Sequence, residues 1–105
     1  MTGRLAIVGL GPGAPELITP LASDTLAAAT DLVGYAPYLV RVPQRPGQRR
    51  HASDNREELA RARQALELAT AGKSVAVVSS GDPGVYFRPA RNFSWSAAIR
   101  AVSAR

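Results

Sequence analysis

Residues 74–86 read SVAVVSSGDPGVY, a short apolar run that leads directly into a loop rich in glycine and proline. A continuous apolar run without alternation is typical of a strand buried on both faces of a parallel sheet. Glycines such as Gly81 and Gly84 let the backbone approach a ligand without a Cβ clash, and Pro83 fixes the direction of the chain. We therefore expect a strand over residues 74–79 that ends in a ligand-facing loop.

A second stretch nearer the amino terminus has the same design. Residues 5–8 read LAIV, and residues 9–15 read GLGPGAP, which is too rich in glycine and proline to be anything but a loop. Thr19 and Pro20 then suit the cap and the first position of a helix that runs to about Ala29. Residues 31–35 (DLVGY) indicate another short strand.

The middle of the chain predicts a loop, a brief strand and a clear helix. Residues 36–50 contain Pro37, Pro43, Pro46 and Gly47, which indicates an exposed loop, and residues 49–52 suit a brief edge strand. Asp54 with Glu57 is close to a capping box. The helix that follows has apolar residues at helical spacing and ends before a glycine: Leu59, Ala62, Leu66, Ala69 and Gly72.

Strands and helices therefore alternate along the chain, which predicts an α/β fold with a parallel sheet and flanking helices. Both glycine loops follow strands, so they fall at the carboxyl ends of those strands, where open α/β sheets bind ligands. Each of three further side chains at or near this edge has two possible roles. Tyr35 and Tyr38 either pack within the fold or contact a substrate, and Asp82 either caps a turn or contacts a ligand.

The first loop also matches a dinucleotide fingerprint through Gly9, Gly11 and Ala14, with Asp31 about twenty residues further on. That fingerprint needs a helix opening directly under the pyrophosphate, whereas the helix signal here starts only at Thr19. Asp31 also begins its strand, which puts it at the wrong end of the sheet. A tight turn without a ligand remains open for this loop, and the second loop lacks the lysine of a triphosphate-binding loop.

Composition excludes several classes of function. The 105 residues carry a net charge of +5 and no cysteine, which fits one small cytoplasmic domain without disulfides or thiolate metal sites.

His51 is the sole histidine, so no metal site or histidine triad is supported, and we expect it to be structural or exposed. No stretch approaches a membrane span. Arg49, Arg50 and Arg56 are interpreted as solvated charge rather than substrate contacts.

The excess charge belongs to the end of the chain. All eight acidic and nine of the thirteen basic residues lie at or before Asp82, and the other four arginines follow it. We therefore expect no nucleic-acid surface on the body. Residues 87–105 hold both phenylalanines and the one tryptophan, and Pro89 would interrupt a helix from the loop. We expect a domain over residues 1–86 and an atypical tail over 87–105 that is poorly ordered or displaced from its ancestral sequence, with a short helix over residues 96–104 as an alternative.

Three segments resemble the tetrapyrrole methylase family: residues 7–19 (IVGLGPGAPELIT), residues 31–35 and residues 77–86 (VVSSGDPGVY). Between the first and the last of them, residues 34–38 and 53–59 form a further set. The last set is similar to one branch, the precorrin-3B C17-methyltransferases of cobalamin synthesis. The resemblance covers residues 3–86 and implies the N-terminal domain of the family fold, with the C-terminal domain absent.

The resemblance implies methyl transfer from S-adenosylmethionine to a ring carbon of a precorrin-3B-like tetrapyrrole. It assigns cofactor binding to Pro12, Ser80, Gly81, Asp82, Val85 and Tyr86, and substrate binding to Gly9, Gly11, Gly13 and Tyr35. It names no catalytic residue and no metal. Family members are typically dimeric, so a homodimer is also implied, without independent support from the residues.

The sequence departs from the family after Tyr86, where Phe87, Arg88 and Pro89 stand in place of small residues that lead into a helix. One hypothesis is that the chain is a truncated or frame-disrupted product that is inactive by itself. The alternative is a non-catalytic α/β binding module that uses its basic tail to contact a partner.

Overall fold

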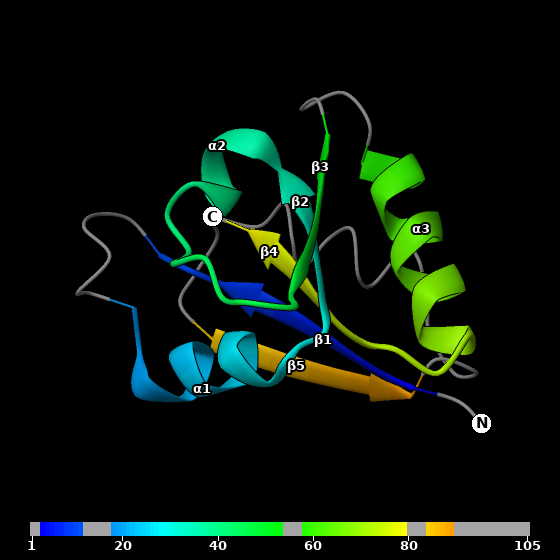
Figure 1. Cartoon of the computed structure of the whole chain (residues 1–105), viewed down its shortest axis with the longest axis horizontal. Helices are drawn as coiled ribbons and strands as arrows, with labels where there is room; N and C mark the ends of the chain where they lie inside the picture. Colours follow the sequence, from blue (N-terminus) through cyan, green and yellow to red (C-terminus); the bar gives the residue numbers. More distant parts are fainter. Residues whose placement is uncertain (1–2, 12–17, 54–57, 80–83, 90–105) are drawn as a thin grey trace.

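The computed structural model describes residues 3–11, 18–53, 58–79 and 84–89. Within these ranges five strands and three helices follow one another along the chain (Figure 1). Their order is β1 (Arg4–Gly9), α1 (Pro20–Ala28), β2 (Asp31–Tyr35), α2 (Ala36–Leu39), β3 (Arg49–Ser53), α3 (Glu58–Thr70), β4 (Ser74–Ser79) and β5 (Gly84–Pro89).

The strands form one sheet in the order β3-β2-β4-β1-β5. β3, β2, β4 and β1 are parallel to their neighbours, which confirms the predicted parallel sheet. β5 pairs with β1 in the antiparallel direction, so the complete sheet is mixed.

β5 was not predicted: residues 84–86 were expected to belong to the second glycine loop, and residues 87–89 to the atypical tail. Pro89 argues against a helix, but the sequence gives no sign that an antiparallel strand replaces it. A proline is tolerated at the end of an edge strand because part of the backbone there has no neighbour to bond. Pro89 lies opposite Arg4 at the far end of β1.

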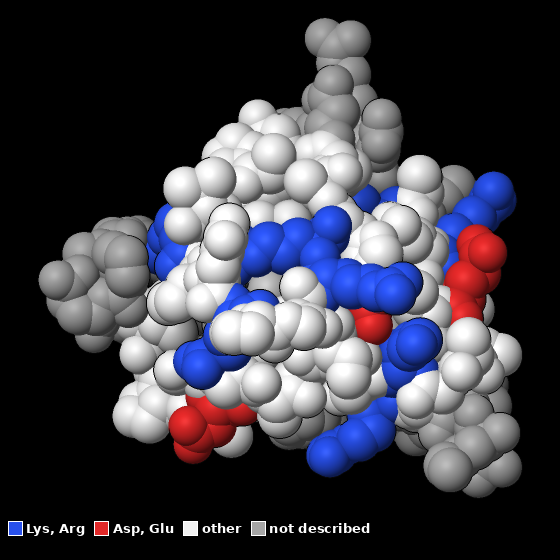
Figure 2. All heavy atoms as spheres, in the orientation of Figure 1, with Lys and Arg blue, Asp and Glu red and all other residues white. Residues whose placement is uncertain are grey.

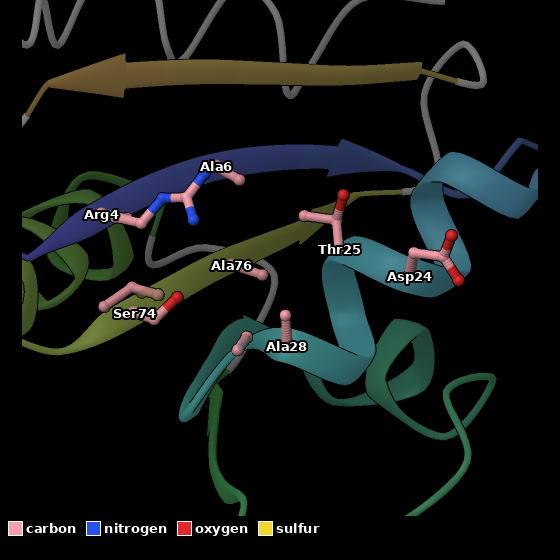
Figure 3. A pocket seen from close by; sticks show the side chains of 9 residues that line it. Arg4, Ala6, Asp24, Thr25, Ala28, Ser74 and Ala76 are labelled. Carbon is pink, nitrogen blue, oxygen red and sulfur yellow. The ribbon is translucent and has the colours of Figure 1, made fainter.

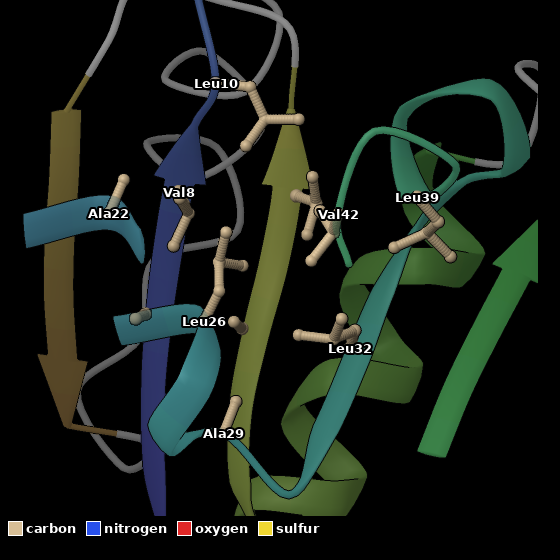
Figure 4. Close-up of a cluster of buried hydrophobic side chains, with 11 residues drawn as sticks. Val8, Leu10, Ala22, Leu26, Ala29, Leu32, Leu39 and Val42 are labelled. Carbon is tan, nitrogen blue, oxygen red and sulfur yellow. The ribbon is translucent and has the colours of Figure 1, made fainter. Parts of the chain in front are cut away.

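Helices cover both faces of the sheet because alternate strand residues point to opposite sides. Val8, Leu32 and Val78 join Leu26 of α1 in a cluster on one face (Figure 4). Ile7, Val33 and Val77 join a second cluster on the other face, under α3. Burying a side chain of this size contributes about 1.5–3 kcal/mol, so the continuous apolar strands predicted from sequence are stable only between two helical layers.

Local signals place α1 as predicted. The Thr19 hydroxyl oxygen accepts a hydrogen bond from the Ala22 N–H at 3.2 Å, and Pro20 occupies the first turn. Ala22, Leu26 and Ala29 form the buried face, whereas Leu21 is 57% exposed. The cap thus fixes where the helix starts, and the apolar stripe fixes which side it buries.

α3 buries a stripe of small side chains, Ala62, Ala65 and Ala69, against the sheet, while Leu66 is only partly buried. Gly72 follows with a φ of 97°, a left-handed conformation that glycine adopts without a Cβ penalty. The helix therefore ends where the sequence predicts. The predicted cap at Asp54 and Glu57 lies outside the described residues.

The segment 36–50 is more ordered than the predicted exposed loop. Ala36–Leu39 forms the short helix α2, and Pro37 is compatible with it because the first turn needs no N–H donor. Leu39 and Val42 are both 3% exposed and join the α1-side cluster. The strand expected over residues 49–52 is present as β3.

In the described part of the chain, no helix is long and apolar enough to cross a membrane.

Candidate functional site

The carboxyl ends of the four parallel strands meet at one edge of the sheet, which we call the carboxyl edge. β1 ends at Gly9, β2 at Tyr35, β3 at Ser53 and β4 at Ser79. β5 runs the other way, so its first residue, Gly84, lies opposite Gly9 at the same edge. The described residues that flank both glycine loops are therefore neighbours here, as the sequence predicts.

The start of the first loop is anchored to β4. The Leu10 N–H donates to the Ser79 carbonyl over 2.8 Å, one step beyond the β1–β4 ladder. Leu10 is 1% exposed, and Gly11 turns the chain with a φ of 70°. An L-residue in that left-handed conformation costs about 1–2 kcal/mol, so Gly11 is the residue suited to this turn. The burial of Leu10 and the left-handed turn at Gly11 thus fix the path of the backbone at the carboxyl edge.

Gly34 lets β2 and β4 approach closely just below this edge. A Cβ at Gly34 would lie 3.0 Å from the Val78 carbonyl oxygen and 3.4 Å from the Val78 Cβ. At the next position, Tyr35 packs edge-on against Tyr38 of α2, with ring centroids 5.1 Å apart and an interplanar angle of 89°. Aromatic pairs favour this geometry, and it places a rigid, amphipathic aromatic surface at the end of β2.

The structure brings part of the predicted site together. Gly9, Gly11 and Tyr35 lie at the carboxyl edge, although β4 separates the strand of Tyr35 from that of Gly9. Val85, half-buried against the α1-side cluster, lies opposite Val8, and Tyr86 lies opposite Ile7, further from the edge. The other predicted site residues, Pro12, Gly13, Ser80, Gly81 and Asp82, lie outside the described residues.

A shallow crevice of about 190 Å³ opens at the other end of the sheet, between α1 and the strands β1 and β4 (Figure 3). Arg4 and Ser74, which begin those strands, line it together with Thr25 and Ala28 of α1. Apolar side chains and the polar side chains of Arg4, Asp24, Thr25 and Ser74 line it together, but it lies at the end of the sheet opposite Gly9, Ser79 and Gly84, which flank the glycine loops. We therefore take the carboxyl edge, not this crevice, as the candidate site.

Asp31 also lies at the amino end of the sheet, where it begins β2, and it is 2% exposed. The Thr30 hydroxyl donates to Asp31 Oδ1 over 2.8 Å, and His51 Nε2 lies 2.9 Å from Asp31 Oδ2. An ionised carboxylate only accepts, so His51 Nε2 carries a hydrogen, and Nδ1 is free to accept from the Gln64 amide at 3.2 Å. The ring therefore links β2 to α3.

Opposing influences set the pKa of Asp31. Burial raises it, but the hydrogen bonds from His51 and Thr30 and the electrostatic interactions with His51 and Lys73 outweigh burial, so the pKa of Asp31 lies below its ordinary value of 3.8. Since Asp31 is enclosed by these partners at the amino end, it cannot contact a ribose at the carboxyl edge. This geometry removes the dinucleotide interpretation of the first loop.

Comparison with protein families matches residues 4–102 to the tetrapyrrole (corrin/porphyrin) methylases. The cobalamin biosynthesis protein CobIJ of Mycobacterium tuberculosis is 62% identical over 86 residues, which are 82% of this chain and 17% of that protein. The precorrin-3B C(17)-methyltransferase of a Sinorhizobium species is 55% identical over 86 residues, 82% of this chain and 34% of that protein.

Among solved structures, the methyltransferase CobJ superposes with a TM-score of 0.76 at 47% sequence identity. The match covers 93% of this chain and 38% of CobJ. The chain therefore spans about a fifth to two fifths of the length of these relatives.

Proposed function

This chain belongs to the tetrapyrrole methylase family, and we propose that its carboxyl edge forms part of a site for methyl transfer from S-adenosylmethionine to a reduced tetrapyrrole. The proposed substrate is a precorrin-3B-like ring, and the proposed reaction is C17 methylation in cobalamin biosynthesis. The observation that supports it best is the meeting of Gly9, Ser79 and Gly84 at one point of the sheet. Two loops rich in glycine start from that point.

In this reaction the main role of the protein is to position the two reactants. S-adenosylmethionine supplies an activated methyl group on a sulfonium, and the ring carbon attacks that methyl group in line with the bond to sulfur. The chain's own contribution is to hold both reactants in register and to exclude water, which can supply several kcal/mol of the barrier, about 7–11 in favourable cases. Backbone groups next to glycine suit this role because they approach a ligand without a side chain between.

We assign the cofactor to Pro12, Ser80, Gly81, Asp82, Val85 and Tyr86, and the tetrapyrrole to Gly9, Gly11, Gly13 and Tyr35. The positions of Gly9, Gly11 and Tyr35 at the carboxyl edge support their share of this assignment. Val85 is one step from the edge, close enough for its backbone to take part. Tyr86 is a weaker member because it lies opposite Ile7, in the body of the sheet.

Because the chain spans a minor part of its relatives, we propose that it supplies one side of the site and does not catalyse methyl transfer by itself. In this proposal the family domain includes residues 1–86 and the end of β5, residues 87–89, which pair with β1, and a tail of separate character follows. We further propose a cytoplasmic location and, by family resemblance, a homodimer.

Calorimetric titration with S-adenosylhomocysteine tests the proposal. We expect weak but measurable binding that Gly81→Val abolishes, because a branched side chain would block backbone approach. Gly47→Val, compared as folded protein, is the control: a new Cβ there meets nothing within 4 Å, although the φ of 79° strains any side chain. Loss of binding in both variants, or no binding by the natural sequence, would contradict the proposal. Salt-sensitive association with an anionic partner in place of nucleoside binding would favour the alternative of a binding module.

A further inference from the structure

Arg41 is a guanidinium with no counterpart in the described part of the chain. Its Nε and Nη2 atoms are buried, and neither has a hydrogen-bond partner there. Leaving a charged group out of water without a partner costs several kcal/mol, so such groups are normally paired. Within the described residues these two atoms lack the partner that a guanidinium normally has, and a ligand can supply it.

The position of Arg41 relates it to the candidate site. It follows α2, which begins directly after the carboxyl end of β2. Its neighbours Leu39 and Val42 are packed in the cluster that contains Leu10 and Val78. Arg41 thus belongs to a segment fixed against the ends of β1 and β4, where Leu10 and Ser79 lie.

A second arginine fixes this segment. Arg50 of β3 donates through Nη1 to the Leu39 carbonyl over 2.6 Å and through Nη2 to the Val42 carbonyl over 2.5 Å. The two arginines therefore differ: Arg50 donates to backbone carbonyls, whereas Arg41, in the turn that Arg50 holds, has two guanidinium atoms without a partner among the described residues. Figure 2 shows more basic than acidic side chains on the face of the molecule that it displays, which favours an anionic ligand there.

An aromatic surface lies on the same turn. The Arg41 N–H donates to the Tyr38 carbonyl over 3.1 Å, the spacing of one helical turn, so the two residues lie on the same side of the turn. Tyr38 in turn packs on Tyr35. A flat ring with carboxylate side chains matches an aromatic surface beside a guanidinium, which binds carboxylates in a two-pronged geometry.

We propose that Arg41 is a substrate-binding residue that pairs with a carboxylate on the rim of the tetrapyrrole. This inference rests on the proposed function and deepens it, because it assigns to this chain a specific contact with the acidic side chains of the ring.

Fluorescence titration of the whole chain with uroporphyrin, a porphyrin with carboxylate side chains, tests the assignment. We expect Arg41→Gln to weaken binding by about tenfold, the usual effect of losing one charge-assisted hydrogen bond. Arg41→Lys keeps the charge without the two-pronged geometry and should lie between the two. Arg45→Gln is the matched control, because it removes the same charge from an exposed position in the same segment, and it should change affinity by less than twofold.

Thermal unfolding of Arg41→Gln supplies an independent readout. An unpaired guanidinium gives no stability to the fold, so this variant should unfold at the same temperature as the natural sequence or higher. A lower unfolding temperature would show a structural role and overturn the assignment. So would equal losses of affinity in Arg41→Gln and Arg45→Gln, unchanged affinity in Arg41→Gln, or no binding of uroporphyrin by the natural sequence. The S-adenosylhomocysteine titration separates the two proposals: if it succeeds while the Arg41 test fails, the proposed function stands without this contact.

Discussion

The amino and carboxyl ends of the sheet are built from different kinds of residue. At the amino end, Asp31 is held by Thr30 and His51, and the Ser74 N–H donates to the Thr30 hydroxyl over 3.1 Å, although Gln48 Oε1 is buried without a partner among the described residues. At the carboxyl end, Gly9, Gly11 and Gly84 leave backbone without side chains, and Arg41 has no partner in the described residues. In the proposed function, the amino end stabilises the fold and the carboxyl end contacts the ligand.

Backbone hydrogen bonds also join the elements at the amino end of the sheet. The Gly3 N–H donates to the Ala69 carbonyl over 2.6 Å, and the Arg4 N–H donates to the Lys73 carbonyl over 3.0 Å, which ties β1 to the end of α3. Gln48 bonds the Leu26 and Ala29 carbonyls at the end of α1. Substitutions at the two ends should therefore separate into those that change stability and those that change binding.

The largest effect is expected at Asp31. Asp31→Ala removes the acceptor for Thr30 and His51 in a buried position and should lower the free energy of unfolding by about 2–4 kcal/mol. Denaturant unfolding measures this change. Asp24→Ala, at an exposed position on α1, is the control and should change stability by less than about 0.5 kcal/mol. Nearly equal effects would mean that the amino end does not depend on its buried carboxylate.

Part of the Asp31 contribution should depend on pH. The pKa of Asp31 in the folded state lies below 3.8, so its stabilisation is complete above the unfolded-state pKa and is lost as pH falls through the folded-state pKa. The difference in stability between the natural sequence and Asp31→Asn should therefore be constant at neutral pH and shrink below about pH 4. Urea unfolding midpoints at several pH values measure it, and a difference that grows on acidification would contradict the assigned direction.

Two glycines with a left-handed backbone conformation allow the effects on stability and on ligand binding to be compared. Gly11 has a φ of 70° at the carboxyl edge, and Gly47 has a φ of 79° in the loop before β3. Gly11→Ala and Gly47→Ala should each lower stability by about 1–2 kcal/mol, the cost of a Cβ in that conformation. Only Gly11→Ala, which changes a residue assigned to the tetrapyrrole, should also weaken uroporphyrin binding when the folded proteins are compared by fluorescence titration. Equal binding by both variants would remove the distinction between the ends.

The smallest effect is expected at Gln64. Its amide supports His51 from α3, but the contact is exposed, and alanine has the higher helix propensity. Gln64→Ala should change the free energy of unfolding by no more than about 0.5 kcal/mol. A loss as large as that of Asp31→Ala would show that the His51 contact, rather than burial and Thr30, controls Asp31.

Elements with a local cause were predictable from sequence. The apolar runs at residues 5–8 and 74–79 can be satisfied only inside a sheet covered on both faces, and Thr19 with Pro20 fixes the start of α1. The glycine loops then fall at the carboxyl edge by topology alone, and the family resemblance, rather than spacing, adds the cofactor and the substrate.

Features that depend on tertiary contacts were not predictable. β5 forms because it pairs with β1. The helix α2 was not predicted because it contains Pro37 and lies in a segment rich in proline, which indicates a loop. The contact between Asp31 and His51 joins residues 20 positions apart through the pairing of β2 with β3. Arg41 is indistinguishable from other arginines in the sequence, and only its burial without a partner makes it a candidate.

Amide chemical-shift mapping of the uniformly labelled chain during titration with S-adenosylhomocysteine tests most directly which end of the sheet binds a ligand. We predict that the largest shifts among the described residues occur at Gly84 and Val85, beside the residues assigned to the cofactor, with the amides of Arg4, Thr25 and Ser74 unchanged. Shifts concentrated instead at Arg4, Thr25 and Ser74 would place the ligand in the crevice beside α1 and contradict the assignment of the carboxyl edge as the binding site.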